Sequence, residues 1–230
     1  MRRICRFLAL VLALSGAVRA EAAAPTVAAR LRQFSPAVDQ RLGPEFRRSG
    51  APHPPRHLFL LAFKEEDVVE LWAGSRRDDP EPVLVKSYPV LAASGGPGPK
   101  LREGDLQVPE GSYRVLWLNP ASSYHLSMKL DYPNAFDRAR AREEGRTRLG
   151  GDIFVHGKDV SIGCLALGDR AIEELFVLAA RVGVANVDFL IAPRDLRVKP
   201  PPPLDGQRPW VGRLWSDLAS TLRRFPPAPR

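Results

Sequence analysis

The sequence predicts a mainly β domain with flanking helices, in the α+β class. Short apolar runs rich in aromatic and β-branched residues recur between residues 57 and 192, separated by turn residues, which is typical of strands. Helical patterns precede and follow this region and interrupt it near its end. The chain of 230 residues is long enough for one good core, with segments to spare at both ends.

The N-terminus has the three parts of a secretory signal. The basic start Met1-Arg2-Arg3 precedes an apolar run from Phe7 to Val18, and Val18-Arg19-Ala20 fits a small-residue cleavage site. The run is shorter than the roughly 20 residues that span a bilayer, so an uncleaved anchor is the less favoured alternative. Cys5 precedes the run, so it is not the lipid-bearing cysteine of a lipoprotein signal. We expect residues 1–20 to be a signal peptide and the protein to be exported.

Loss of this signal changes both the charge and the cysteine count. The formal net charge of +8 falls to +4, because four arginines leave with residues 1–20 and no acidic residue does. This balance does not favour nucleic acid as a partner, and export argues against it. Cys164 becomes a lone cysteine in a compartment where cysteines usually pair. It is therefore an intermolecular bridge, a reactive thiol or an inert buried residue.

Residues 21–56 are predicted to form a helical lead-in and a linker. After an Ala-rich start that we expect to be flexible, Ser35 and Pro36 suit the N-cap and first position of a helix. A short helix is predicted from there to Gly50, interrupted at Gly43-Pro44. The proline-rich segment that follows should be extended.

Residues 57–195 are predicted to form the main domain. The acidic turn Glu65-Glu66-Asp67 separates its first two strands, which should pair as a hairpin. Residues 93–111 are rich in Gly and Pro and predict a long irregular loop of the kind that often carries function. The segments with the composition or alternation of strands are 57–64, 68–74, 82–90, 111–118, 123–130, 152–157 and 187–192.

Helices are predicted in three further places. The charged residues 135–149 suit a solvated helix or lid. Asp169 is expected to cap a helix that ends at Gly183 and has one apolar face. Residues 196–230 form a Pro-rich tail that ends in an amphipathic helix. Its apolar face either packs back onto the domain or lies on a membrane surface as a peripheral contact.

The chemistry concentrates in "IFVHGKDVSIGC", residues 153–164. Cysteine catalysis needs a thiolate, a base to form it and donors for the oxyanion. His156 lies at the end of a predicted buried strand, and Gly157 and Gly163 permit the turn that returns the chain to Cys164. The amides of Gly163 and Cys164 are candidates for the oxyanion hole, and Ser161 for stabilising the turn or positioning substrate. A thiol beside histidine is expected to have a lowered pKa.

The motif "HGKDVSIGC" resembles the active-site motif of the L,D-transpeptidase catalytic domain, the YkuD type. Its short loop resembles the YafK-like branch, as do "GPGPKLREGDLQVPEGSYRV", "NPASSYHLSMKLDYPNAFD" and "ALGDRAIEELF". The resemblance covers residues 57–192 and implies a β-sandwich or barrel-like domain in a periplasmic enzyme. It implies that Cys164 is the nucleophile and His156 the base, with the Gly157 carbonyl as the imidazole's partner.

The same resemblance implies acyl transfer on peptidoglycan stem peptides, at the bond between meso-diaminopimelate and D-alanine. Many members carry a second histidine before the Gly-Cys pair and an arginine two residues after the cysteine. Ile162 and Ala166 stand there instead, as in the YafK-like branch, so the group that binds the substrate carboxylate is unidentified. The tentative substrate-binding residues come from the flanking motifs and are Lys100, His125, Ser127, Tyr132 and Asn134.

Three functions are compatible with the sequence. The first is an L,D-transpeptidase that passes the acyl group to an amine. The second uses the same chemistry with water, as a carboxypeptidase or as an amidase that releases wall-attached proteins. The third is a catalytically silent wall-binding module, which the intact pair of Cys164 and His156 disfavours. No cofactor is implied, and the scattered histidines make a zinc site improbable.

Overall fold

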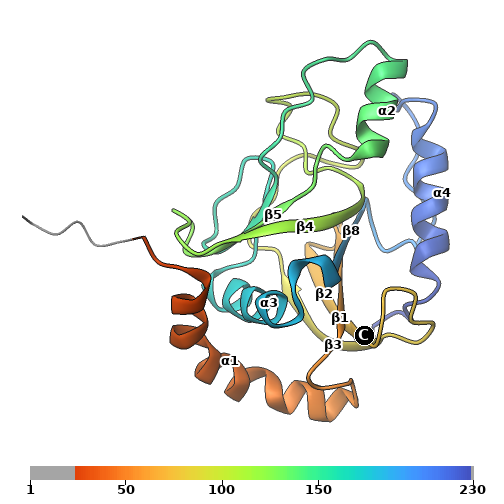
Figure 1. Ribbon diagram of the computed structural model, residues 1–230. Coiled ribbons are helices and arrows are strands. Elements are labelled where there is room, and N and C mark those ends of the chain that lie inside the picture. The colour runs from red at the N-terminus through yellow and green to blue at the C-terminus, as the bar shows by residue number, and fades with distance from the viewer. Residues whose placement is uncertain (1–23, 229–230) are drawn as a thin grey trace, which may run out of the picture.

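The computed structural model describes residues 24–228, so the predicted signal peptide, residues 1–20, lies outside the described residues. Eight strands form one curled sheet in the order β3-β2-β1-β8-β4-β5-β6-β7 (Figure 1). Helices flank this sheet, which confirms the predicted fold class. The strands are β1 (His57–Phe63), β2 (Val68–Gly74), β3 (Val83–Pro89), β4 (Gly111–Asn119), β5 (Ser127–Leu130), β6 (Phe154–His156), β7 (Leu165–Ala166) and β8 (Val187–Ala192).

The predicted strands all form, and β1 and β2 pair as the expected hairpin. β5 is shorter than predicted because His125 has a φ of 71°, a left-handed conformation that extended backbone does not adopt. The two-residue strand β7 was not predicted. The first half of β4 pairs with β8 and its second half with β5, with a bulge between Val115 and Trp117. β4 thereby joins two halves of the sheet where it curls.

The N-terminal helix α1 (Val27–Ser49) is longer than predicted. The prediction that Ser35 is its N-cap is wrong, because Thr26 accepts a hydrogen bond from the Ala29 amide and caps it nine residues earlier. Pro36 and Pro44 lie on its exposed side, where the carbonyls they leave without a donor can bond to water. The face that packs on the domain repeats every four residues and outweighs both prolines: Phe34, Val38, Leu42 and Phe46.

Helix α3 (Asp169–Val182) packs against one face of the sheet, with α1 outside it (Figure 1). Its predicted cap is wrong: Gly168 is the N-cap residue, and the Asp169 carboxylate instead accepts a hydrogen bond from the Lys158 amide at 2.9 Å. Glu174 is buried in this helix and binds Arg41, Lys86 and the Tyr88 hydroxyl. These contacts tie α3 to α1 and β3.

Two shorter helices lie elsewhere on the sheet. The predicted charged helix is α2 (Ala135–Glu143), capped by Asn134, whose side chain accepts from the Phe136 and Asp137 amides. Helix α4 (Val211–Leu222) covers the face of the sheet opposite α3. Its predicted apolar face is buried against the sheet, so that face is covered by the domain itself: Val211, Leu214, Trp215, Leu218, Leu222 and Phe225.

A buried carboxylate connects α4 to the glycine-rich loop. Glu110 is fully buried and accepts hydrogen bonds from the Trp215 indole at 2.7 Å and from the Gly98 amide at 2.7 Å. The Lys64 ammonium lies 3.1 Å from the same carboxylate and donates to the carbonyls of Gly98 and Val108. Burial lowers the pKa of Lys64, against the opposing effect of Glu110. The loop predicted to be irregular is therefore held at fixed points.

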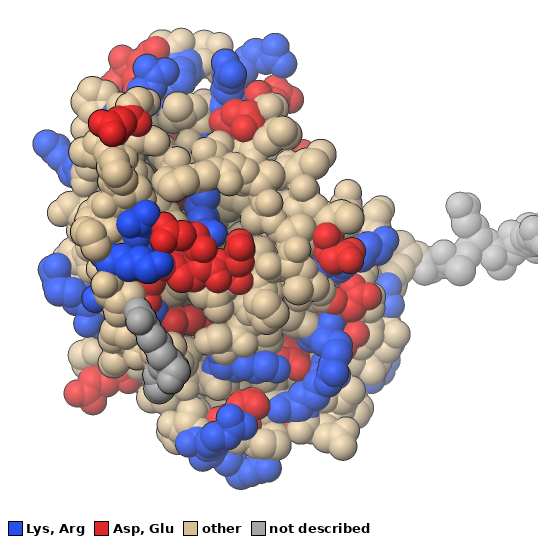
Figure 2. Space-filling view, turned by 180° about the vertical axis from the view of Figure 1, so that it is seen from behind, with Lys and Arg blue, Asp and Glu red and all other residues tan. Residues whose placement is uncertain are grey.

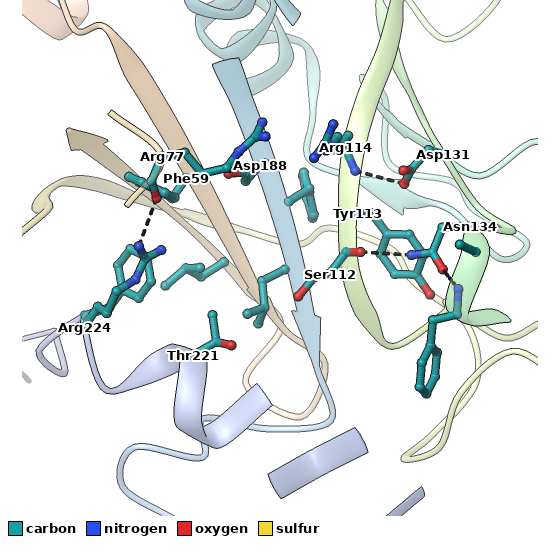
Figure 3. A pocket seen from close by; sticks show the side chains of 16 residues that line it. Phe59, Arg77, Ser112, Tyr113, Arg114, Asp131, Asn134, Asp188, Thr221 and Arg224 are labelled. Atoms are coloured by element: carbon teal, nitrogen blue, oxygen red, sulfur yellow. Dashed lines mark hydrogen bonds and ion pairs between the residues drawn. The ribbon is translucent and has the colours of Figure 1, made fainter. Parts of the chain in front are cut away.

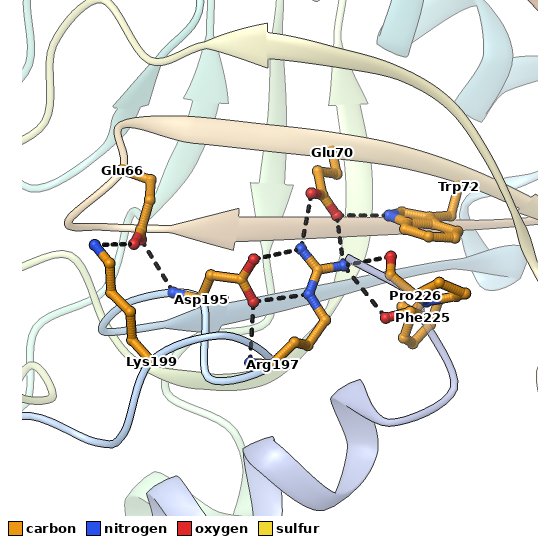
Figure 4. Close-up of polar contacts among 8 residues, drawn as sticks. All are labelled: Glu66, Glu70, Trp72, Asp195, Arg197, Lys199, Phe225 and Pro226. Atoms are coloured by element: carbon orange, nitrogen blue, oxygen red, sulfur yellow. Dashed lines mark hydrogen bonds and ion pairs between the residues drawn. The ribbon is translucent and has the colours of Figure 1, made fainter. Parts of the chain in front are cut away.

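The segment before α4 is held by Arg197 (Figure 4). Its guanidinium binds the Glu70 carboxylate at 2.8 Å and the Asp195 carboxylate at 2.7 Å, and lies 4.7 Å from the centre of the Phe63 ring. It also donates to the carbonyl of Pro226, beyond the helix. Both ends of the tail are thus fixed to β2 by one buried cation.

Charges on the side seen in Figure 2 are mixed, with acidic side chains at the centre directly beside basic ones. A large field of one sign does not develop on this face, although the whole chain is basic. None of the helices within residues 24–228 is both long and apolar enough to cross a membrane.

Trp215→Ala should lower the free energy of unfolding by about 3–5 kcal/mol, because it opens a cavity and removes one of the hydrogen-bond donors of the buried Glu110 carboxylate. Guanidinium denaturation followed by circular dichroism measures this. Trp117→Ala is the matched control, since Trp117 is 46% exposed and should cost about 1 kcal/mol or less. Equal losses in the two variants would contradict the role given to Trp215.

Candidate active site

Strands β4 to β7 carry a polar face opposite the core. Met128, Val155 and Leu165 point into the core and are at most 2% exposed. Because successive side chains of a strand point to opposite faces, their neighbours in sequence point away from the core. The strand register then places seven side chains together on that other face: Trp117, Asn119, Ser127, Lys129, Phe154, His156 and Cys164.

A cavity of about 370 Å³ opens on this face. His156 and Cys164 both line it, so the fold brings together the two residues that the sequence singles out. Tyr124, Val160 and Ile162 give its rim an apolar character, and Ile162 is 81% exposed. The complete lining is Asn119, Ser122, Ser123, Tyr124, Ser127, Phe154, His156, Val160, Ser161, Ile162 and Cys164.

The imidazole of His156 is buried and oriented by one hydrogen bond. Its Nδ1 lies 2.7 Å from the Gly157 carbonyl, which can only accept, so Nδ1 carries the proton and Nε2 keeps its lone pair. The Tyr124 ring packs against the imidazole with 4.6 Å between ring centres. Burial lowers the pKa of His156, although the Gly157 carbonyl opposes this. At neutral pH the side chain is therefore a neutral base.

The thiol of Cys164 is half-buried and in contact with the backbone of the strand beside it. The Phe154 amide donates to the sulfur at 3.4 Å, and the thiol faces the Asp152 carbonyl at 3.5 Å. Burial raises the pKa of the Cys164 thiol, and the Phe154 amide opposes this only in part. The lowered pKa expected from the sequence is therefore wrong for the resting site, because desolvation outweighs both the Phe154 amide and the Lys129 ammonium.

The turn before Cys164 is closed by Ser161. Its hydroxyl accepts from the Cys164 amide at 2.9 Å and donates to the Cys164 carbonyl at 2.7 Å. The Cys164 amide, a candidate oxyanion donor, is therefore bound to Ser161 in this conformation. Gly163 has a φ of 107°, so its backbone conformation favours glycine.

Gly157 fixes the other end of the loop. Its amide donates to the carbonyls of Tyr124 and Leu126, and a Cβ there would lie 2.8 Å from the Tyr124 carbonyl oxygen and 2.6 Å from the Asp169 carboxylate. The next residue, Lys158, is held by its bond to Asp169. The backbone that carries His156 is thus packed too closely to accept a side chain at Gly157.

Of the tentative substrate-binding residues, the structure places only Ser127 on this cavity. His125 turns to the other side and binds the Glu173 carboxylate at 3.0 Å. The Tyr132 hydroxyl is buried and donates to the Leu149 carbonyl. Asn134 caps α2, and Lys100 binds the Asp105 carboxylate at 2.6 Å. These four side chains fold the segments around the site and do not face the cavity.

Sequence reasoning missed most of the lining. Asn119, Ser122, Ser123 and Tyr124 all come from the motif "NPASSYHLSMKL", from which the sequence reasoning named Ser127, which lines the cavity, and His125, which does not. The left-handed conformation at His125 reverses which side chains face the cavity, and a strand predicted over 123–130 could not reveal this.

A second cavity, of about 470 Å³, lies between the sheet and the helices α2 and α4 (Figure 3). Arg77, Arg114 and Arg224 surround an apolar floor that includes Phe59, and Arg77 is paired with the Asp188 carboxylate. Its lining contains neither cysteine nor histidine. Within residues 24–228, no group of three His, Cys, Asp or Glu side chains is arranged to hold a metal ion.

Comparisons with known proteins agree with the motif. The YkuD family, described as the L,D-transpeptidase catalytic domain, matches residues 64–187, which is more than half of the chain. YafK of Escherichia coli K12, provisionally named an L,D-transpeptidase, is 37% identical over 121 residues. That match covers 52% of this chain and 46% of YafK, so it spans about half the length of that relative.

Two solved structures share parts of the fold at low identity. The helical cell shape determining protein Pgp2 of Campylobacter jejuni has a TM-score of 0.48 and 21% identity, covering 69% of this chain and 56% of Pgp2. L,D-transpeptidase 1 of Mycobacterium tuberculosis has a TM-score of 0.35 and 14% identity, covering 59% of this chain and 62% of that one. The family assignment rests on the sequence match: the chain belongs to the L,D-transpeptidase catalytic domain family.

Gly157→Ala should displace the loop that carries His156, because the added Cβ meets the Tyr124 carbonyl at less than contact distance. We expect about 1–3 kcal/mol of lost stability, measured by thermal unfolding. Gly151→Ala is the matched control, since its Cβ meets nothing within 4 Å. A Gly157→Ala protein as stable as the control would show that the loop adapts.

The rate of Cys164 alkylation by iodoacetamide should rise with pH to a midpoint above that of free cysteine, about 8.5, since burial raises the thiol pKa. Mass spectrometry of the peptide that carries Cys164 measures the rate. In His156→Gln the midpoint should stay nearly unchanged, because the resting imidazole is neutral. A midpoint near 7 that rises in His156→Gln would instead reveal a resting thiolate–imidazolium pair.

Proposed function

We propose that this protein is an exported peptidoglycan L,D-transpeptidase that uses Cys164 as nucleophile and His156 as general base. One observation carries the proposal: a thiol and a neutral imidazole with a free Nε2 line the same cavity. Membership of the L,D-transpeptidase catalytic domain family supports the reaction class. The secretory pattern of residues 1–20 supports export to the periplasm, where peptidoglycan lies.

The first half of the proposed reaction acylates the enzyme. His156 Nε2 takes the thiol proton as the Cys164 sulfur attacks the carbonyl carbon of meso-diaminopimelate in a stem peptide. The new C–S bond forms, the C–N bond to D-alanine breaks, and the imidazolium returns its proton to the leaving amine. D-alanine leaves, and the stem remains as a thioester on Cys164.

The second half transfers the acyl group. An amine of a second stem peptide attacks the thioester carbon, a C–N bond forms and the C–S bond breaks. The amine proton passes through His156 to the thiolate, which restores both side chains. Water in place of the amine gives a shortened stem, and an amine-linked protein in place of D-alanine gives release of that protein.

The negative charge that develops on the carbonyl oxygen needs donors. In the resting site the Ser161 hydroxyl binds both the amide and the carbonyl of Cys164. For the Cys164 amide to serve as a donor, its bond to Ser161 must open when substrate binds. The turn is therefore the part of the site that we expect to rearrange during catalysis.

Cys164→Ala and His156→Ala should each lower turnover of tetrapeptide-containing muropeptides by about 10³-fold or more, because each removes one half of the proton-transfer pair. Incubation with defined sacculi, followed by chromatography and mass spectrometry of the digested wall, measures this. Crosslinked products support transfer to an amine, whereas shortened stems or released adducts support transfer to water.

Asn186→Ala, at an exposed position outside the cavity, is the control and should retain turnover. Full activity of Cys164→Ala would refute the cysteine mechanism. A folded native protein without turnover, and without an adduct at Cys164 after carbapenem treatment, would favour a wall-binding module.

A further inference from the structure

We infer that Lys129 binds a free carboxylate of the stem-peptide substrate and so determines which peptides reach Cys164. The inference rests on the proposed function and names the group that fixes the substrate. The arginine that many family members carry two residues after the cysteine is absent here, and Ala166 stands in its place. Lys129 is a cation on the face of the sheet that carries Cys164, and it can take this role.

The register of the sheet places Lys129 in line with the nucleophile. Lys129 pairs with Trp117 on one side and with Phe154 on the other. Because Val155 pairs with Leu165, Phe154 lies beside Cys164, and its amide contacts the sulfur. Lys129 and Cys164 thus flank Phe154 on the same face of the sheet. Two strand spacings of about 4.8 Å separate their backbones, which a peptide residue can bridge.

Aromatic side chains define the environment of the Lys129 ammonium. It lies 4.8 Å from the centre of the Phe154 ring, and the Trp117 ring packs edge-on against that same ring. Its side chain is only 14% exposed, so the aromatic rings restrict where the charge can lie. A cation held in this way is ready to bind an anion without losing much side-chain freedom.

The ion partner of Lys129 is one that a substrate can replace. The partner is Asp152, whose side chain is 88% exposed. Because this carboxylate is almost fully in water, it gives up little when it leaves the ammonium, so a substrate carboxylate can take its place. Lys100 differs, because it is buried and committed to Asp105 and to the Arg102 carbonyl.

Lys158 is the competing cation. Its ammonium lies 5.7 Å from the centre of the Tyr124 ring, beside the cavity, but the residue is exposed and belongs to the loop after His156. It does not share the sheet face with Cys164. Lys158→Met is therefore the matched control for Lys129→Met, since both remove one ammonium near the cavity.

The test compares two disaccharide tetrapeptides, one with the free carboxylate of meso-diaminopimelate and one with that carboxylate amidated. The native protein should prefer the free carboxylate. Lys129→Met should raise KM for this substrate about 10- to 100-fold, leave KM for the amide nearly unchanged and change kcat less than KM. Lys129→Arg should keep most of the preference, and Lys158→Met should keep all of it.

Asp152→Asn separates substrate binding from a structural ion pair. If Lys129 binds substrate, this variant loses a competing anion, so KM for the free carboxylate should stay equal or fall. If Lys129 serves only its pair with Asp152, Asp152→Asn and Lys129→Met should weaken the enzyme alike, which would overturn the inference. So would an undiminished preference in a folded Lys129→Met protein, or its loss in Lys158→Met.

The same experiment distinguishes a failure of the proposed function from a failure of the inference about Lys129. If the native protein turns over neither substrate, the proposed function itself falls, and the role of Lys129 falls with it. If the native protein turns over both with equal KM, the function stands and the inference about Lys129 is overturned.

Discussion

Side chains in β5, β6 and β7 alternate between the two faces of the sheet, and this alternation separates the core from the site. Met128, Val155 and Leu165 belong to the core, while the residues beside them reach the cavity. A slip of one residue in this register would bury the thiol and the imidazole and expose apolar side chains to water. Burial of the core face therefore specifies the geometry of the face that carries His156 and Cys164, and the cavity needs no separate scaffold.

Elements remote in sequence hold this short part of the sheet in place. β7 has only two residues, so its position depends on the loops at either end. On one side Asp169, at the start of α3, binds the backbone after His156. On the other, Glu110 ends the glycine-rich loop, and Trp215 of the tail binds that carboxylate. The tail thus holds the glycine-rich loop in place, although it follows the last strand.

The fold was largely predictable because its strands are apolar and its turns are marked by Gly, Pro and acidic residues. The pair of His156 and Cys164 was also found from the sequence, through its spacing, its glycines and the family resemblance. The start of α1 was not predicted correctly, because the packing of Phe34 inside the helix overrides the cap-like residue Ser35. The remaining lining depends on one left-handed residue, His125, and on strand register, neither of which a local pattern encodes.

Burial acts on His156 and Cys164 in a way that suits a lone thiol. It raises the pKa of Cys164 and lowers that of His156, so both are neutral at rest and the thiolate is scarce. Oxidation of cysteine follows its thiolate character and exposure, so a neutral, half-buried thiol resists it. In the proposed exported location this resistance matters, because the compartment is oxidising. In the mechanism that we propose, proton transfer to Nε2 is required only when a carbonyl carbon is in place, so positioning of the substrate is the step that activates the thiol.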